Sequence, residues 1–275
     1  MVPLDANPRS SATPSPALPR EAAGESAARP TITVLIPVRN RAGERLANCL
    51  ASLRWQVGAP AYEIVLSDYG SSPDYAEAID ELARRFDARV VRTATDGVWN
   101  RSRALNFGIQ AAQGRFVLCT DADMIFAPNF LATAWARQRA RDGRAFVVCR
   151  CRDLPESVPE QAWRREDFAS LMARAPFREK LGTGACQFAA RTFFEGIRGY
   201  DEGYEFWGME DNDMLFRAQR SGLCREWMHE HTAMLHQWHP SQRGRRPMRK
   251  VLNDLRFHLT KRVRVKNPRG WGSRR

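Results

Sequence analysis

Short apolar segments alternate with segments of helical periodicity over the first part of the chain. Four segments have the length and apolar composition of buried strands: residues 31–37, 62–67, 89–91 and 115–119. Three segments between them have the periodicity of helices: residues 45–54, 74–86 and 100–112. Strands that alternate with helices form a mostly parallel sheet flanked by helices. We therefore expect an α/β fold that binds its ligands at the carboxyl ends of the strands.

Polar side chains follow three of these strands. They occur in Pro37-Val38-Arg39-Asn40-Arg41, at Asp68 and in Asp121-Ala122-Asp123. Because the carboxyl ends of parallel strands lie at one edge of a sheet, these side chains are expected to lie together. Two carboxylates one residue apart can reach the same hard divalent cation, although a turn at a strand end favours the same acids.

A second acidic segment, Trp207-Gly208-Met209-Glu210-Asp211-Asn212-Asp213, lies further along the chain. Trp207 has a ring that can stack on a sugar, and Asp211 can accept a proton. Acids in the first turn of a helix would give the same pattern, so the segment alone supports either interpretation. The upstream Gly182-Thr183-Gly184-Ala185 favours either a close backbone approach to a ligand or an ordinary tight turn.

These segments, with Asn100 to Gly108 between them, resemble the metal-dependent GT-A glycosyltransferases over residues 31–239. Within that fold the chain is most similar to the group of the β-1,4-galactosyltransferases and the bacterial chondroitin-polymerase type enzymes. The resemblance implies a Rossmann-like GT-A fold and an inverting transferase. Its donor would be a nucleotide-sugar, usually a UDP-sugar. A hexose or N-acetylhexosamine would pass to a hydroxyl of a saccharide, lipid-linked or peptide acceptor.

The resemblance also implies a role for individual residues. Asp211 would be the catalytic base, and the cofactor would be Mn²⁺ or Mg²⁺. The direct metal ligands would be Asp123 and one downstream histidine, for which His236 fits best and His239 is the alternative. The nucleotide would contact Pro37, Arg39, Arg41, Asp68, Arg101 and Asp121. The sugars would contact Gly184, Trp207, Gly208 and Glu210. Two departures from the family pattern, Ser67 before Asp68 and Met209 in place of a common glycine, leave the nucleotide base and the acceptor geometry open.

Four of the five histidines lie between His229 and His239. A zinc site is disfavoured because no paired set of Cys or His completes a tetrahedral shell. We expect His229 and His231 to be structural residues that alternate along a strand. The six cysteines are scattered in apolar surroundings, which predicts buried thiols and not a disulfide framework.

The net charge of +12 arises entirely after residue 239, where thirteen Lys and Arg accompany the single acid Asp254. Five apolar residues recur there at helical spacing: Met248, Leu252, Leu255, Leu259 and Val263. We expect a basic amphipathic helix whose apolar stripe packs on the main domain. The alternatives are contact with an anionic membrane or with phosphates.

The predicted organisation has three parts. Residues 1–30, rich in Pro, Ala and Ser, form a disordered tail. Residues 31–240 form the GT-A domain, with a nucleotide-binding half (31–125) and an acceptor and catalytic half (126–240). Residues 241–275 form the basic helix and tail.

No apolar run reaches the length of a membrane span, and a secretory signal is not recognisable, so we expect a cytoplasmic protein, either free or peripheral at the inner membrane face. Two other functions stay open. One is a retaining glycosyltransferase or a nucleotidyltransferase on the same scaffold. The other is a nucleic-acid or membrane-binding protein that acts through its basic end. Nucleic acid is disfavoured because no aromatic platform accompanies the basic residues.

Overall fold

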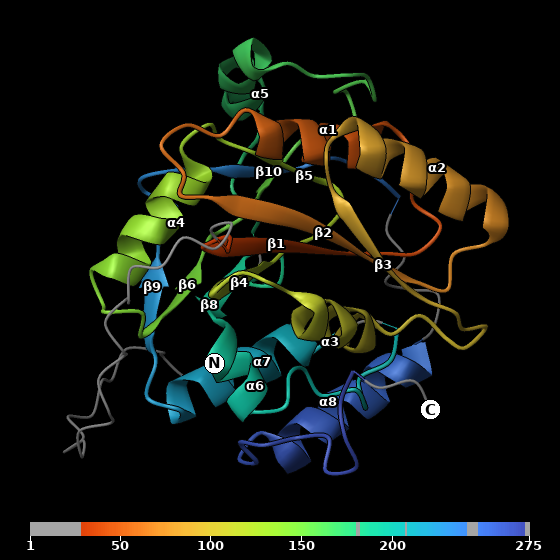
Figure 1. The fold of residues 1–275 in the computed structure, drawn as a ribbon, viewed down its shortest axis with the longest axis vertical. Helices are drawn as coiled ribbons and strands as arrows, with labels where there is room; N and C mark the ends of the chain where they lie inside the picture. Colours follow the sequence, from red (N-terminus) through yellow and green to blue (C-terminus); the bar gives the residue numbers. More distant parts are fainter. Residues whose placement is uncertain (1–28, 180–181, 207, 241–246, 273–275) are drawn as a thin grey trace.

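The computed structural model describes residues 29–179, 182–206, 208–240 and 247–272. They form a seven-stranded central sheet with helices on both faces, and a small three-stranded sheet lies beside it (Figure 1). This architecture confirms the predicted α/β fold.

The central sheet has the strand order β3-β2-β1-β4-β8-β6-β9. Strands β3, β2, β1 and β4 are parallel, β8 runs antiparallel to both of its neighbours, and β9 is parallel to β6. The chain order reverses between β1 and β4, which is where open α/β sheets bind ligands. The strands are β1 (Ile32–Val38), β2 (Tyr62–Tyr69), β3 (Arg89–Thr93), β4 (Phe116–Cys119), β6 (Ala145–Val148), β8 (Gln187–Ala190) and β9 (Cys224–Trp227).

Both faces of the sheet are covered because alternate residues of each strand point to opposite sides. Ile32, Val34 and Ile36 of β1 pack in one core with α1 (Glu44–Arg54), α2 (Pro73–Arg85) and α4 (Phe130–Arg139). Leu35 of the same strand packs on the other side. The helices of that side are α3 (Arg101–Ala111), α6 (Arg191–Gly196) and α7 (Glu210–Arg220).

The small sheet joins chain segments that are distant in sequence. Strand β10 (Met234–His236) pairs antiparallel with β5 (Met124–Phe126) and parallel with β7 (Arg152–Asp153). His236 lies opposite Met124 in this register, and the amide of Gln237 donates to the carbonyl of Asp123 over 2.9 Å. The pairing therefore brings the end of β10 next to the acidic turn after β4. A 3₁₀ turn (Arg165–Asp167) and α5 (Phe168–Arg174) complete the outer layer on this side.

The predicted C-terminal helix exists as α8 (Pro247–Thr260), but its predicted orientation is wrong. Met248, Leu252, Leu255 and Leu259 are exposed, and the opposite face, with Asn253 and Phe257, is buried. The sequence pattern could not indicate this outcome because the contacts that fix the helix are polar and come from residues 201–205.

The remaining structural expectations have mixed outcomes. All six cysteines are free, and five of them are buried while Cys224 is exposed. His229 and His231 do not alternate along a strand but lie in the turn between β9 and β10, where His229 packs edge-on against Phe177 and Trp227. Residues 1–28 of the predicted tail and Trp207 lie outside the described residues. In the described ranges, none of the helices has both the length and the hydropathy needed to cross a membrane.

Candidate active site

A cavity of about 910 Å³ lies at the carboxyl ends of β1 and β4. It is lined by side chains from both predicted halves of the domain, and by most of the residues that the sequence singled out. From that set the lining contains Pro37, Arg39, Arg41, Arg101, Asp121, Asp123, Glu210, Asp211, His236 and His239.

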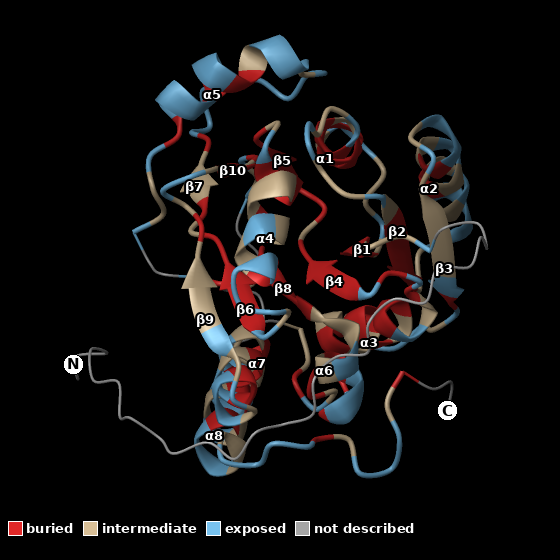
Figure 2. Ribbon diagram, turned by 60° about the vertical axis from the view of Figure 1, so that its left-hand side comes forward, coloured by how far each residue is buried: buried red, intermediate tan, exposed pale blue. Residues whose placement is uncertain are grey.

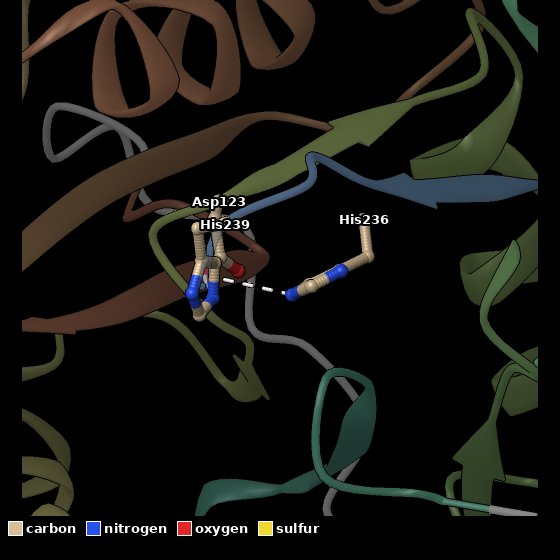
Figure 3. A group of neighbouring side chains, drawn as sticks. All are labelled: Asp123, His236 and His239. Atoms are coloured by element: carbon tan, nitrogen blue, oxygen red, sulfur yellow. Dashed lines mark ion pairs between the residues drawn. The ribbon is translucent and has the colours of Figure 1, made fainter. Parts of the chain in front are cut away.

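Asp123, His236 and His239 form the one group of three or more His, Cys, Asp and Glu side chains in the described parts of the chain that is arranged to hold a metal ion. Oδ2 of Asp123 lies 3.1 Å from Nε2 of His239 and 3.8 Å from Nε2 of His236. The three side chains point toward one another in Figure 3. Both histidines that the sequence offered as alternatives thus reach the same aspartate.

The chemistry of this group fits a cation. Oδ1 of Asp123 is buried and has no hydrogen-bond partner among the described residues, which is costly unless an ion or water completes its shell. Burial raises the pKa of Asp123. The hydrogen bond from His239 and the charges of His236 and Arg41 lower it by a larger amount, so that the pKa is about 2. The carboxylate is therefore ionised at neutral pH, as a metal ligand must be.

Asp153 is a member of the site that sequence reasoning missed. Its Oδ1 lies 3.2 Å from Nδ1 of His236, and Arg178 donates to the same carboxylate over 2.6 Å. A carboxylate on the far nitrogen of a histidine fixes the tautomer and leaves Nε2 free for a ligand. Leu154 and Phe177, which lie near Asp153 in the chain or in the structure, also line the cavity. The contact of Asp153 with His236 depends on β7 pairing with β10, which no local pattern predicts.

Arg101 connects the two acidic segments of the sequence. Its guanidinium lies 2.9 Å from Oδ1 of Asp121 and 2.9 Å from Oδ1 of Asp211, and it donates to the carbonyl of Gly184 over 2.9 Å. Burial disfavours the charged form, but the carboxylates of Asp121 and Asp211 hold the pKa of Arg101 well above its usual value. The position follows from α3, whose first residue is Arg101 and whose N-cap, Asn100, accepts a hydrogen bond from the amide of Arg103.

Glu210 and Asp211 lie in the first turn of α7, so the segment begins a helix as one interpretation predicted, and both side chains also line the cavity. Burial raises the pKa of Glu210, and the charge of Asp211 raises it further, to about 7, against the opposing effect of Arg101. Burial also raises the pKa of Asp211, again opposed by Arg101. Two carboxylates with raised pKa values beside one cavity are typical of acid–base chemistry.

Gly184 allows this arrangement. A Cβ atom there would lie 2.0 Å from Oδ2 of Asp211, so any side chain would displace that carboxylate. Gly208 does not line the cavity and has a φ of 106°, and Met209 adopts a φ of 73°, which is unusual for a residue with a side chain. This is the position at which the resemblance expects glycine.

Asp68 does not line the cavity. Its buried carboxylate lies 2.9 Å from Nε of Arg92 and accepts from the amide of Ser71 over 3.1 Å. Ser71 in turn accepts from the amide of Asn40, which does line the cavity. Asp68 therefore supports the loop beside the cavity in this structure, and a direct contact with the nucleotide stays a prediction.

Comparison with known proteins agrees with this geometry. The family model for glycosyl transferase family 2 matches residues 33–203, more than half of the chain. In alignments of 226 residues that cover 70% of this chain, the sequence is 25% identical to the chondroitin synthase of Escherichia coli and to the hyaluronan synthase of Pasteurella multocida. The chain spans only 32% and 23% of those two proteins.

Two solved structures share the fold. A mannosyltransferase from Pyrobaculum calidifontis in complex with GDP-Man and Mn²⁺ superposes with a TM-score of 0.57 at 19% identity, over 88% of this chain and 66% of that one. A crystal structure of GalNAc-T7 with UDP, GalNAc and Mn²⁺ gives 0.62 at 17% identity, over 86% of this chain and 48% of that one. The fold is thus the GT-A fold of glycosyltransferases, and the chain belongs to glycosyl transferase family 2.

Proposed function

We propose that this protein transfers a hexose or N-acetylhexosamine from a nucleoside-diphosphate sugar to an acceptor hydroxyl, with inversion at the anomeric carbon. The observation that carries the proposal is the composition of the cavity of about 910 Å³. Its wall combines a carboxylate–histidine group suited to a divalent cation with a separate carboxylate, Asp211, suited to accept a proton. A metal-dependent inverting transfer needs these two functions at one site.

Asp211 acts as the general base. As the acceptor oxygen attacks the anomeric carbon, its proton passes to Asp211 and the bond between that carbon and the diphosphate oxygen breaks with its electron pair. The nucleotide then leaves with the negative charge. The raised pKa of Asp211 makes it a better proton acceptor than an exposed aspartate.

Arg101 holds the base in place. Its bonds to Asp121, Asp211 and the Gly184 carbonyl fix the Asp211 carboxylate before a substrate arrives, and pre-positioned groups supply much of an enzyme's rate. The same guanidinium faces the cavity, where its fork suits a diphosphate.

Asp123, His236 and His239 are the proposed metal ligands, and Asp153 orients His236. A divalent ion held there would neutralise the charge that develops on the diphosphate. Mn²⁺ accepts imidazole together with carboxylate and phosphate oxygen, which favours it over Mg²⁺. Mn²⁺ is also present in both similar structures.

Pro37, Arg39 and Arg41 would line the nucleotide, since they follow β1 at the point where the strand order reverses. This supports the division into a nucleotide-binding half, 31–125, and a catalytic half, 126–240. We propose UDP as the nucleotide from the resemblance to UDP-sugar enzymes. The GDP-Man of one similar structure makes GDP the alternative to test.

A thermal-shift panel of UDP, GDP, CDP and ADP, each with and without Mn²⁺, tests the proposal. A ligand that binds only the folded state raises the melting temperature. We expect a rise with UDP that requires Mn²⁺. The absence of a rise with every nucleotide would contradict the proposal. Product analysis with the UDP-sugars identified in this way then tests inversion, because a retained anomeric configuration would exclude Asp211 as the base.

A further inference from the structure

Helix α8 presents its apolar face to solvent. Five side chains on this face are largely exposed: Met248 (70%), Val251 (59%), Leu252 (49%), Leu255 (54%) and Leu259 (73%). At 100° per residue all five fall within one side of the helix. Figure 2 shows α8 at the edge of the molecule, largely exposed. We call these five residues the α8 apolar face.

The orientation of α8 is fixed by polar contacts on its opposite side. Arg256 donates twice to the fully buried carboxylate of Asp201, over 2.9 and 2.6 Å. Asn253 donates to the carbonyl of Glu205 over 3.0 Å, and Arg249 pairs with the Glu205 carboxylate. The ring of Phe257 packs edge-on against that of Phe216, with 5.4 Å between the ring centroids. Rolling the helix to bury its leucines would leave Asp201 without Arg256, which is costly for a buried charge.

The exposed apolar surface of the protein is concentrated here. Of the twelve large apolar side chains that are exposed in the described residues, seven lie between Met248 and Val265. Exposed apolar patches of this kind mark an interaction surface. Val263 and Val265 extend the patch beyond the helix and alternate with Arg262 and Arg264, which are also exposed.

The charge around the patch indicates the partner. The one acid in the last 36 residues, Asp254, is paired with Lys250 over 2.6 Å, while thirteen cations lie in the same stretch. A second copy docked through this face would bring two such basic ends together, which is unfavourable. An apolar face beside exposed arginines instead matches a bilayer that carries anionic headgroups.

We propose that α8 and residues 261–265 form a docking surface for an anionic lipid bilayer. The α8 apolar face enters the boundary between headgroups and acyl chains, and Arg262 and Arg264 contact lipid phosphates. The bilayer would then lie across α8 from Glu205, whose neighbour Phe206 lines the cavity.

Flotation of the full chain with lipid vesicles tests this surface directly. Vesicles of phosphatidylcholine alone are compared with vesicles that also contain phosphatidylglycerol. We expect binding to the mixed vesicles only. The triple variant Leu252→Ser, Leu255→Ser and Leu259→Ser should lower that binding by about 100-fold, because three leucines no longer enter the bilayer. The double variant Arg262→Gln and Arg264→Gln should lower it by roughly 30-fold.

The chain offers a matched control. Val57, Tyr75 and Met172 are exposed to a similar extent, between 37% and 50%, but lie on other surfaces. Their triple serine variant should bind mixed vesicles like the wild type, and both triple variants should keep the wild-type melting temperature because all six side chains are at the surface.

Four results would overturn the proposal. The first is equal binding to both kinds of vesicle, or binding to neither. The second is equal loss of binding in the α8 and control variants. The third is a wild-type dimer in light scattering that the α8 triple variant dissociates, which would identify a second copy of the chain as the occupant. RNA binding lost in the arginine variant, without vesicle binding, would identify nucleic acid instead.

Discussion

Asp211 and Asp213 lie two residues apart in the first turn of α7, yet they face different regions of the molecule. Asp211 faces the cavity, where Arg101 and solvent reach it. Asp213 does not line the cavity and lies in a buried cluster with Arg217, at 2.8 Å, and Lys266, at 3.4 Å. Lys266 also lies 3.4 Å from Asp201, the anchor of α8. We call Asp201, Asp213, Arg217, Arg256 and Lys266 the buried ion cluster.

The difference teaches how one acidic segment serves two purposes. Residues two apart on a helix point about 200° away from each other. The first carboxylate can therefore take part in chemistry, while the second one pairs with Lys266 in the segment that follows the C-terminal helix. Four predictions separate these roles.

The largest expected effect is on catalysis by Asp211→Asn. The amide keeps a hydrogen-bond acceptor for Arg101 but cannot take a proton, so we expect transfer from a UDP-sugar to fall about a thousandfold. UDP binding and the melting temperature should stay close to wild type. The measurement is initial-rate kinetics with calorimetric titration of UDP. A normal turnover number would show that another residue is the base.

Asp213→Asn should instead reduce stability. It leaves Arg217, which is fully buried, without a charged partner, and breaking such a pair lowers the free energy of unfolding by about 3 kcal/mol. Urea unfolding of Asp213→Asn beside Asp211→Asn measures this, and each variant is the control for the other. If Asp213→Asn and Asp211→Asn were equally stable, the proposed difference between the structural role of Asp213 and the catalytic role of Asp211 would be wrong.

Gly184→Ala should lower the turnover number by about 100-fold, because the new methyl group moves the carboxylate of Asp211 out of position. Gly182→Ala is the matched control in the same segment, since a Cβ atom there meets nothing within 4 Å. Steady-state kinetics on both variants provide the comparison. Equal turnover numbers would mean that the position of Asp211 is not critical.

The smallest effect concerns pH. Burial and the charge of Asp211 raise the pKa of Glu210 to about 7, so the pair takes up a proton as the pH falls through that value. We expect the specificity constant, kcat/KM, to fall below about pH 7. Glu210→Gln removes the negative charge beside Asp211, so the acidic limb of the kcat/KM pH profile should move to lower pH. An unmoved limb in the pH profile would show that the two carboxylates titrate independently.

The first half of the domain, residues 31–125, was predictable because its signals are local. Each strand from β1 to β4 is an apolar run followed by polar residues, and a parallel sheet places those ends together. Arg39, Asp121 and Asp123 therefore reached one cavity as expected, and the resemblance supplied His236 and Asp211.

The rest depends on long-range contacts. Asp153 reaches His236 through the pairing of β7 with β10, and Asp68 is held by Arg92 from the neighbouring strand. The orientation of α8 follows from Asp201, 55 residues before its partner Arg256. A helical stripe of leucines normally packs inward, and the contacts of α8 with Asp201 and Glu205 reverse that preference here.

Calorimetric titration of UDP into wild-type protein and Asp123→Ala, with and without Mn²⁺, tests the central claim most directly. The account predicts that Mn²⁺ tightens UDP binding to the wild type by at least about tenfold, through a cation shared by Asp123, His236 and the diphosphate. In Asp123→Ala, Mn²⁺ should no longer tighten UDP binding, and the variant should keep its fold. UDP binding that is unaffected by both Mn²⁺ and the substitution would contradict the proposed metal–nucleotide site.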